Sequence, residues 1–285
     1  MVSSLAYCGR LAPSPTGHLH LGHARTFWTA STRARGAGGR LLLRNDDLDR
    51  DRCRETFVTA IFDDLSWLGL AWHPNVRRQS QHFADYQAAL SKLSRLGLLY
   101  PCFCSRADIA REIAASSTAP HGPGGPLYPG LCRRLDADRR RQRELEGSPF
   151  CLRLDMAASL RLAGPLEWRD VEQGPQLARP ELWGDVVLAR KDMPACYHLA
   201  VTVDDALQGV TLVTRGADLF AASHLHRLLQ ALLGLPVPLW QHHPLLRGAD
   251  GKRLSKRDGA QSLRQLRAQG LSSAEVRAMA RLALA

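Results

Sequence analysis

Histidines and glycines are concentrated near the amino terminus, in residues 13–25, which read PSPTGHLHLGHAR. This segment joins a short apolar run to a stretch with helical periodicity. Backbone amides and the dipole at a helix start favour anions, and imidazole N–H groups donate well to phosphate oxygens. The segment therefore predicts a phosphate site, although a proline-rich turn with exposed histidines remains an alternative from these residues alone.

A second cluster of reactive residues lies more than 200 positions later, where residues 251–257 read GKRLSKR. Only four of the 38 basic residues are lysines, and two of those, Lys252 and Lys256, are found here. A lysine offers a compact charge where an arginine offers a planar fork. Such a charge stabilises the negative charge that develops on a phosphate in a transition state, so Lys256 is a catalytic candidate. A solvated basic turn is the alternative.

Three thiols and a phenol form a third cluster, in CFC at 102–104 and YPGLC at 128–132. Zinc prefers four tetrahedral ligands with sulfur dominant, and three cysteines leave the set one ligand short. His121 is a rival fourth ligand, and buried packing is the alternative for the cysteines. Seven cysteines in a chain of this size indicate reduced thiols or metal ligands. Four others lack such spacing and are predicted to pack: Cys8, Cys53, Cys151 and Cys196.

The composition is that of an ordinary globular protein, with 285 residues, 45% of them apolar and 23% charged. Polar residues interrupt every long apolar stretch, so no membrane span is expected. The first residues show no export signal, and a cytoplasmic location is expected. The net charge of +11 favours a polyanionic partner without identifying it as RNA.

Short apolar runs alternate with helical periodicity on both sides of a different central part. Strands are predicted at 5–9, 40–44, 185–190, 197–203 and 210–215, and helices at 21–34, 55–68, 219–233, near 263 and at 274–284. This alternation predicts an α/β fold with a Rossmann-like, doubly wound parallel sheet. We expect two catalytic halves, 1–98 and 185–285, separated by an inserted subdomain at 99–184. Its arginine-rich segment 133–143 alternates with acidic residues, which is typical of a solvated helix, with RNA contact as the alternative.

Taken together, HLGH at 20–23 and RLSKR at 253–257 resemble the HIGH and KMSKS signatures of class I aminoacyl-tRNA synthetases. RLAPSPTG at 10–17, Tyr197 and GADL at 216–219 narrow the resemblance to the glutamate and glutamine branch. The resemblance covers nearly the whole chain and implies that ATP, with Mg²⁺, activates an amino acid as its adenylate. Two positions depart from the family pattern: Asp46 replaces a glutamate, and Arg253 replaces the first lysine of KMSKS.

The resemblance also implies roles for particular residues. The catalytic residues would be His20, His23 and Lys256. The ATP site would comprise His20, Gly22, His23, Arg253, Leu254, Ser255, Lys256 and Arg257. The glutamate site would comprise Arg10, Leu11, Ala12, Pro13, Ser14, Asp46, Tyr197 and Arg215. Forked guanidinium groups at Arg10 and Arg215 suit a carboxylate and so favour glutamate over glutamine.

Within this branch the chain resembles the short glutamyl-queuosine tRNA(Asp) synthetase family, since only 28 residues follow Arg257 and an anticodon-binding domain is not expected. This resemblance implies one structural Zn²⁺ on Cys102, Cys104, Tyr128 and Cys132. It implies ATP, L-glutamate and queuosine-containing tRNA(Asp) as partners of a monomer. The alternatives are a conventional glutamyl-tRNA synthetase that charges the 3′ end, a related nucleotidyl-transfer enzyme, and a catalytically silent RNA-binding paralogue.

Overall fold

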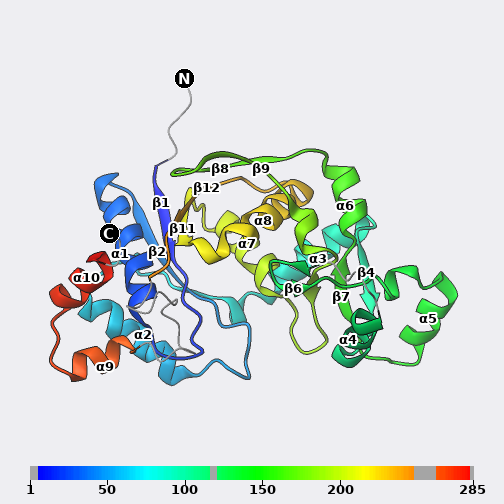
Figure 1. The fold of residues 1–285 in the computed structure, drawn as a ribbon, viewed down its shortest axis with the longest axis horizontal. Coiled ribbons are helices and arrows are strands. Elements are labelled where there is room, and N and C mark those ends of the chain that lie inside the picture. The colour runs from blue at the N-terminus through cyan, green and yellow to red at the C-terminus, as the bar shows by residue number, and fades with distance from the viewer. Residues whose placement is uncertain (1–5, 116–120, 247–260, 283–285) are drawn as a thin grey trace.

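The computed structural model of the protein describes residues 6–115, 121–246 and 261–282 (Figure 1). Its α-helices are α1 (Leu21–Gly36), α2 (Glu55–Trp67), α3 (Phe83–Arg95), α4 (Arg106–Ala115), α5 (Ala137–Leu145), α6 (Met156–Ala163), α7 (Tyr197–Leu207), α8 (Phe220–Leu233), α9 (Leu263–Ala268) and α10 (Ser273–Leu282). Its strands are β1 (Cys8–Leu11), β2 (Arg40–Asn45), β3 (Arg77–Arg78), β4 (Leu99–Cys102), β5 (His121–Gly122), β6 (Gly125–Pro126), β7 (Cys151–Leu154), β8 (Glu167–Asp170), β9 (Gly174–Leu177), β10 (Val187–Ala189), β11 (Leu212–Gly216) and β12 (Leu239–His243). Among the described residues, no helix is both long and apolar enough to cross a membrane.

The catalytic sheet is built from two groups of strands that meet at β1. Strands β1, β2 and β3 pair in parallel, and β11, β12 and β8 form a second parallel group that ends in the antiparallel strand β9. The amide of Thr211 donates to the carbonyl of Cys8 at 2.9 Å, which brings β11 against β1. The predicted α/β fold with a parallel sheet is confirmed.

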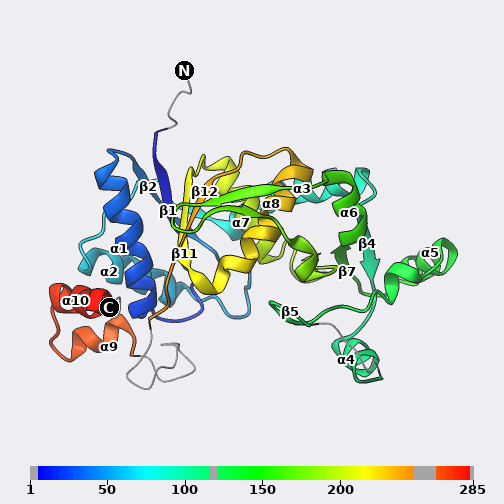
Figure 2. The same ribbon diagram turned by 45° about the horizontal axis from the view of Figure 1, so that its top comes forward.

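Alternation along β2 divides its leucines between the two faces of the sheet, because successive side chains in a strand point in opposite directions. Leu41 and Leu43 pack beneath α1, α2, α9 and α10, whereas Leu42 packs on the other face with Trp168 and Trp240. Figures 1 and 2 show the first set of helices on one side of the sheet and α7 and α8 on the other. Helices therefore lie on both sides of the sheet, as in doubly wound folds.

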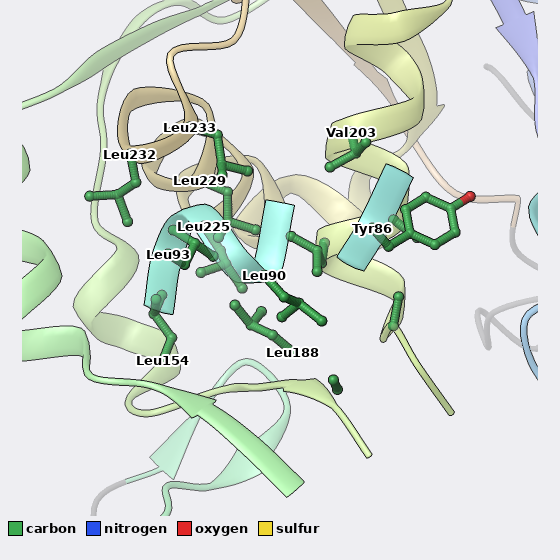
Figure 3. Packing of buried hydrophobic residues seen from close by; sticks show 14 of the residues in the cluster. Tyr86, Leu90, Leu93, Leu154, Leu188, Val203, Leu225, Leu229, Leu232 and Leu233 are labelled. Carbon is green, nitrogen blue, oxygen red and sulfur yellow. The ribbon is translucent and has the colours of Figure 1, made fainter. Parts of the chain in front are cut away.

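A separate apolar cluster packs α7 and α8 against α3, β7 and β10 (Figure 3). Leucines fill most of it, while the ring of Tyr86 points away from them. Its hydroxyl donates to the carboxylate of Asp204 at 3.0 Å. A buried tyrosine needs such an acceptor, so this contact ties α3 to α7.

The strand predicted at 197–203 is wrong, because these residues begin helix α7. Residues 199–205 are all buried, so the helix has no exposed face along this stretch to reveal a 3.6-residue period. A short, continuous apolar run is compatible with either a buried strand or a buried helix. The error matters to the site, since it places Tyr197 in the first turn of a helix.

The central part of the chain contributes to three sheets, one of which is the two-stranded hairpin of β5 and β6. Strands β4, β7 and β10 form an antiparallel sheet, so β10 pairs across the expected boundary at residue 184. The hairpin of β8 and β9 lies before that boundary but extends the catalytic sheet through β12. The arginine-rich segment folds as α5, which has no buried residue.

Candidate active site and thiol cluster

A cavity of about 450 Å³ opens where several parallel strands end. Residues that end or follow β1, β2, β11 and β12 meet there with the start of α1 and the start of α7, the position at which doubly wound sheets bind ligands. The lining residues that the sequence also identified are Arg10, Ala12, Pro13, Ser14, His20, Gly22, His23, Asp46, Tyr197 and Arg215.

The other site residues expected from the sequence either lie away from the cavity or lie outside the described residues. Leu11 is fully buried in the core beneath α1 and does not line the cavity. Arg253, Leu254, Ser255, Lys256 and Arg257 lie outside the described residues.

Two histidine side chains accept hydrogen bonds from backbone amides at the start of α1. The amide of Gly22 donates to Nδ1 of His20 at 3.1 Å, and the amide of His20 donates to Nδ1 of His23 at 3.2 Å. Both Nδ1 atoms therefore act as acceptors, and the neutral tautomer that fits carries its proton on Nε2. That proton is suited to donation toward a phosphate oxygen, and no acidic residue occupies the first turn of the helix.

Position 22 must be glycine because the imidazole ring of His20 lies very close to it. A Cβ atom added at this position would lie 2.9 Å from Cε1 of His20, which is closer than real Cβ contacts. Any side chain there would displace the imidazole that caps the helix, so the glycine keeps the histidine in place.

The two arginines that were expected to hold a carboxylate differ in their partners. Nε of Arg10 donates to Asp205 at 3.1 Å, and Nη1 of Arg10 donates to the carbonyl of Thr214 at 3.3 Å. Arg215 is only 4% exposed, and among the described residues no carboxylate lies within 4 Å of it. Burial lowers the pKa of Arg215, as expected for a cation without a carboxylate partner.

The guanidinium of Arg215 bonds to three neutral groups instead. Nε donates to Nε2 of His242 at 3.0 Å, Nη2 donates to Oγ of Ser223 at 2.6 Å, and Nη1 lies 3.3 Å from Nδ1 of His226. A buried, protonated arginine without a counter-ion is costly, and a substrate carboxylate would relieve that cost. Of the two arginines, Arg215 is therefore better suited to bind an acidic side chain.

Asp46 lines the same cavity and is held from behind by Arg44. Nε of Arg44 donates to Oδ1 of Asp46 at 2.7 Å, and Nη1 of the same side chain donates to Asp205 at 2.6 Å. Burial outweighs this ion pair and raises the pKa of Asp46 to about 6. Asp46 thus presents a carboxylate to the cavity at neutral pH.

Several residues that line or support the cavity were not expected from the sequence. Asp205, in the interior of α7, bridges Arg10 and Arg44, and Oγ1 of Thr26 lies 2.8 Å from Nε2 of His243. The adjacent Asp204 and Asp205 in an otherwise apolar run were the available signal, since buried acidic residues require partners. Nothing local in the sequence indicated which arginines those partners would be.

The three thiols that resemble zinc ligands are brought together by β4 and the loop before α5. Their sulfur atoms all lie within 4.8 Å of one another, and Cys104 and Cys132 are 3.4 Å apart. The phenol oxygen of Tyr128 is 3.3 Å from Sγ of Cys102 and 3.6 Å from Sγ of Cys104. Ligand atoms around a tetrahedral zinc are about 3.5–3.8 Å apart, so these four residues fit the ion.

His121 and Cys151 complete the comparison of candidate ligands. His121 lies in the hairpin of β5 and β6 and is not part of the thiol group found among the described residues. Cys151 lies opposite Cys102 on the neighbouring strand and packs against the cluster. Hydrogen bonding with Cys151, and less strongly with Tyr128 and Arg153, lowers the pKa of the Cys102 thiol to about 4. A thiolate is the form that binds metal.

Comparison with known proteins identifies the family of this chain. Residues 8–284 match the family model described as tRNA synthetases class I (E and Q), catalytic domain. A Glutamyl-Q tRNA(Asp) synthetase of Rhodobacter capsulatus is 48% identical over 273 residues, which cover 94% of this chain and 97% of that protein. A second protein of that name, from Symbiobacterium thermophilum, is 46% identical over 278 residues, covering 93% of this chain and 82% of the relative.

The fold is shared with a solved glutamate tRNA ligase from Elizabethkingia meningosepticum, crystallised in complex with its amino acid. The two structures superpose with a TM-score of 0.76 at 26% sequence identity, over 90% of this chain. The chain spans about half of that ligase, 53% of its length. By sequence and by fold, this chain belongs to the family of class I tRNA synthetase catalytic domains for glutamate and glutamine, and it is a ligase of that class.

Proposed function

We propose that the protein activates L-glutamate with ATP as glutamyl-adenylate and transfers the glutamyl group to the queuosine at the wobble position of tRNA(Asp). The buried Arg215, without a carboxylate partner within 4 Å in the described structure, is the observation that carries the choice of an acidic amino acid. The queuosine acceptor is supported by the names of relatives that match this chain over most of their length.

Different parts of the cavity would bind glutamate and ATP. Arg215 would bind the side-chain carboxylate of glutamate, and Asp46 would attract its ammonium group. The start of α1, with His20 and His23, would bind the phosphates of ATP, with Mg²⁺ accompanying the nucleotide. The substrate's own α-carboxylate then attacks the α-phosphate and pyrophosphate leaves, so the protein supplies alignment and charge and no covalent intermediate is needed.

Pyrophosphate exchange tests the activation half directly. The protein should incorporate labelled pyrophosphate into ATP when glutamate is present and should do so far less with glutamine or aspartate. Glutamine lacks the charge that Arg215 needs, and aspartate is one methylene shorter. Exchange that depends on no amino acid, or on a neutral one, would contradict the proposal and would favour the silent paralogue or another nucleotidyl-transfer enzyme.

Acidification should weaken the use of glutamate through Asp46. Because its pKa is about 6, this carboxyl is charged above pH 6 and becomes neutral as the pH falls below that value. We expect kcat/KM for glutamate to decline as pH falls through about 6, since this ratio reports ionisations of the free enzyme. The measurement is pyrophosphate exchange at subsaturating glutamate between pH 5 and 8.

The Asp46→Asn variant is the control for this pH dependence. It should have a low kcat/KM throughout and should lose the decline near pH 6, because its amide does not titrate. A decline that persists unchanged in the variant would assign the pH dependence to another group.

We also propose a structural Zn²⁺ held by Cys102, Cys104, Tyr128 and Cys132, whose spacing fits four tetrahedral ligands. Bound there, the ion would join β4 to the loop before α5. Protein purified without added metal should contain about one equivalent of zinc, because structural zinc couples to folding. Cys132→Ala should lower both the zinc content and the melting temperature.

Cys53→Ala provides the matched control, since this thiol is half-buried and lies outside the cluster. It should retain the zinc of the parent protein. Metal-free protein that melts at the same temperature as the parent would remove zinc from the proposal.

A conventional glutamyl-tRNA synthetase is the second candidate, since the fold matches a glutamate tRNA ligase. The two candidates share the activation step and differ in the acceptor. Two tRNA substrates separate them: tRNA(Asp) without its 3′-terminal adenosine and tRNA(Asp) without queuosine.

A further inference from the structure

Behind Arg215 lies a chain of buried side chains to which the sequence assigned no role. His242 is the penultimate residue of β12, Asp170 ends β8, and Ser223 lies in α8. Asp170 and His242 are both fully buried at their side chains, and Oδ2 of Asp170 lies 2.7 Å from Nδ1 of His242. The chain therefore runs from Asp170 through His242 to the guanidinium of Arg215.

The hydrogen-bonding capacities of these groups leave one tautomer for His242. Arginine only donates, so Nε2 of His242 must present a lone pair to Nε of Arg215 at 3.0 Å. An ionised carboxylate only accepts, so Nδ1 must carry the proton that it shares with Asp170. The two ends of the ring therefore require the same neutral form, with the proton on Nδ1.

Ionisation of the two groups agrees with this assignment. Burial alone would raise the pKa of Asp170, but bonds from His242 and from two backbone amides lower it, so the carboxylate is charged. Burial and the nearby charge of Arg215 lower the pKa of His242 to about 4, so the ring is neutral at pH 7.

We propose that Asp170 and His242 are positioning residues that aim Arg215 at the side chain of the amino-acid substrate and so select a carboxylate over an amide. This inference rests on the proposed function of the cavity. His242 accepts one N–H of Arg215, Ser223 accepts another, and His226 accepts a third, while Arg215 also lines the cavity beside Tyr197. Oγ of Ser223 also lies 3.2 Å from Nε2 of His242, so the three side chains form one compact group.

Arg215 can select a carboxylate over an amide because the side chains that hold it are neutral. A carboxylate in direct contact with Arg215 would satisfy its charge inside the protein and reduce its attraction for a second carboxylate. Here the negative charge of Asp170 is separated from Arg215 by a neutral imidazole. Arg215 is thereby oriented while its charge remains available to the substrate, and glutamine gains much less from that charge than glutamate.

Substitutions at His242 separate orientation from simple packing. His242→Leu removes the acceptor of the Arg215 Nε–H, and we expect KM for glutamate to rise about tenfold to a hundredfold, as for loss of a hydrogen bond to a charged group. KM for ATP should stay near the parent value. His242→Gln returns an acceptor oxygen at a similar reach and should recover part of the loss. Asp170→Asn should raise KM for glutamate in the same direction, because an amide permits either tautomer.

His224→Leu is the matched control, because His224 is a buried histidine of the same region that accepts from Trp168 and does not contact Arg215. It should keep the parent KM for glutamate and the parent preference for glutamate over glutamine. In His242→Leu that preference should shrink. Folded His242→Leu and Asp170→Asn proteins with parent KM values and parent preference would overturn the proposal.

A measurement on the unchanged protein guards against variants that do not fold. Nitrogen-15 NMR of histidine-labelled protein should show the His242 ring with a protonated Nδ1 and an unprotonated Nε2. A protonated Nε2 would overturn the proposal. A parent protein that shows this tautomer but no glutamate-dependent exchange would instead contradict the proposed function, so the two failures are distinguishable.

Discussion

Labelled glutamate should be transferred to tRNA(Asp) that has lost its 3′-terminal adenosine, and it should not be transferred to tRNA(Asp) that lacks queuosine. In the proposed reaction the nucleophile is a hydroxyl of the modified wobble base, so trimming the distant 3′ end leaves it in place. An unstacked loop nucleotide can be splayed into an active-site pocket, where its extra hydroxyls serve both for recognition and for attack. The measurement is acid-precipitable label on each tRNA after incubation with ATP and glutamate.

The two tRNAs control for each other, because each retains the feature that the other lacks. The conventional candidate requires an intact 3′-terminal ribose, so it predicts no label on the trimmed tRNA, although that tRNA carries queuosine. That result would contradict queuosine as the acceptor and would leave glutamate activation standing.

Replacing Lys256 by alanine should reduce glutamyl-adenylate formation by roughly two orders of magnitude or more, as expected when one preorganised charge is removed from a transition state. Lys256 occupies the second-lysine position of the KMSKS-like motif, in a chain that uses only four lysines among 38 basic residues. The pentacovalent phosphorus and the departing pyrophosphate gain negative charge that a compact ammonium would stabilise. Single-turnover formation of the adenylate measures the effect without requiring RNA.

Lys191→Ala is a suitable comparison, because Lys191 is exposed and does not line the active-site cavity. It should form adenylate at the parent rate. Both variants should melt at the parent temperature, which would separate catalysis from folding. A Lys256→Ala protein that forms adenylate as fast as the parent would contradict a catalytic role for Lys256.

Local sequence patterns predicted β2 and α1 from two different signals. Leu41, Leu42 and Leu43 alternate between the two core clusters of the sheet, and the strand at β2 follows from that short apolar run. Helix α1 was predicted from its helical period. The same reasoning failed for α7, because a helix buried along residues 199–205 shows no exposed face. Hydrophobic periodicity reveals a helix only where one face is exposed and polar and the other is buried and apolar.

Ten of the site residues expected from the sequence line the cavity, so the residue types found there could be predicted without the fold. The electrostatic environment of each of these residues is set only when the chain folds. Arg10 and Arg215 are the same residue type in the sequence, yet folding brings Asp205 from 195 positions away to Arg10 and surrounds Arg215 with neutral acceptors. The charge that a side chain can offer a ligand depends on its neighbours in space, and those neighbours come from strands and helices that meet only when the sheet is assembled.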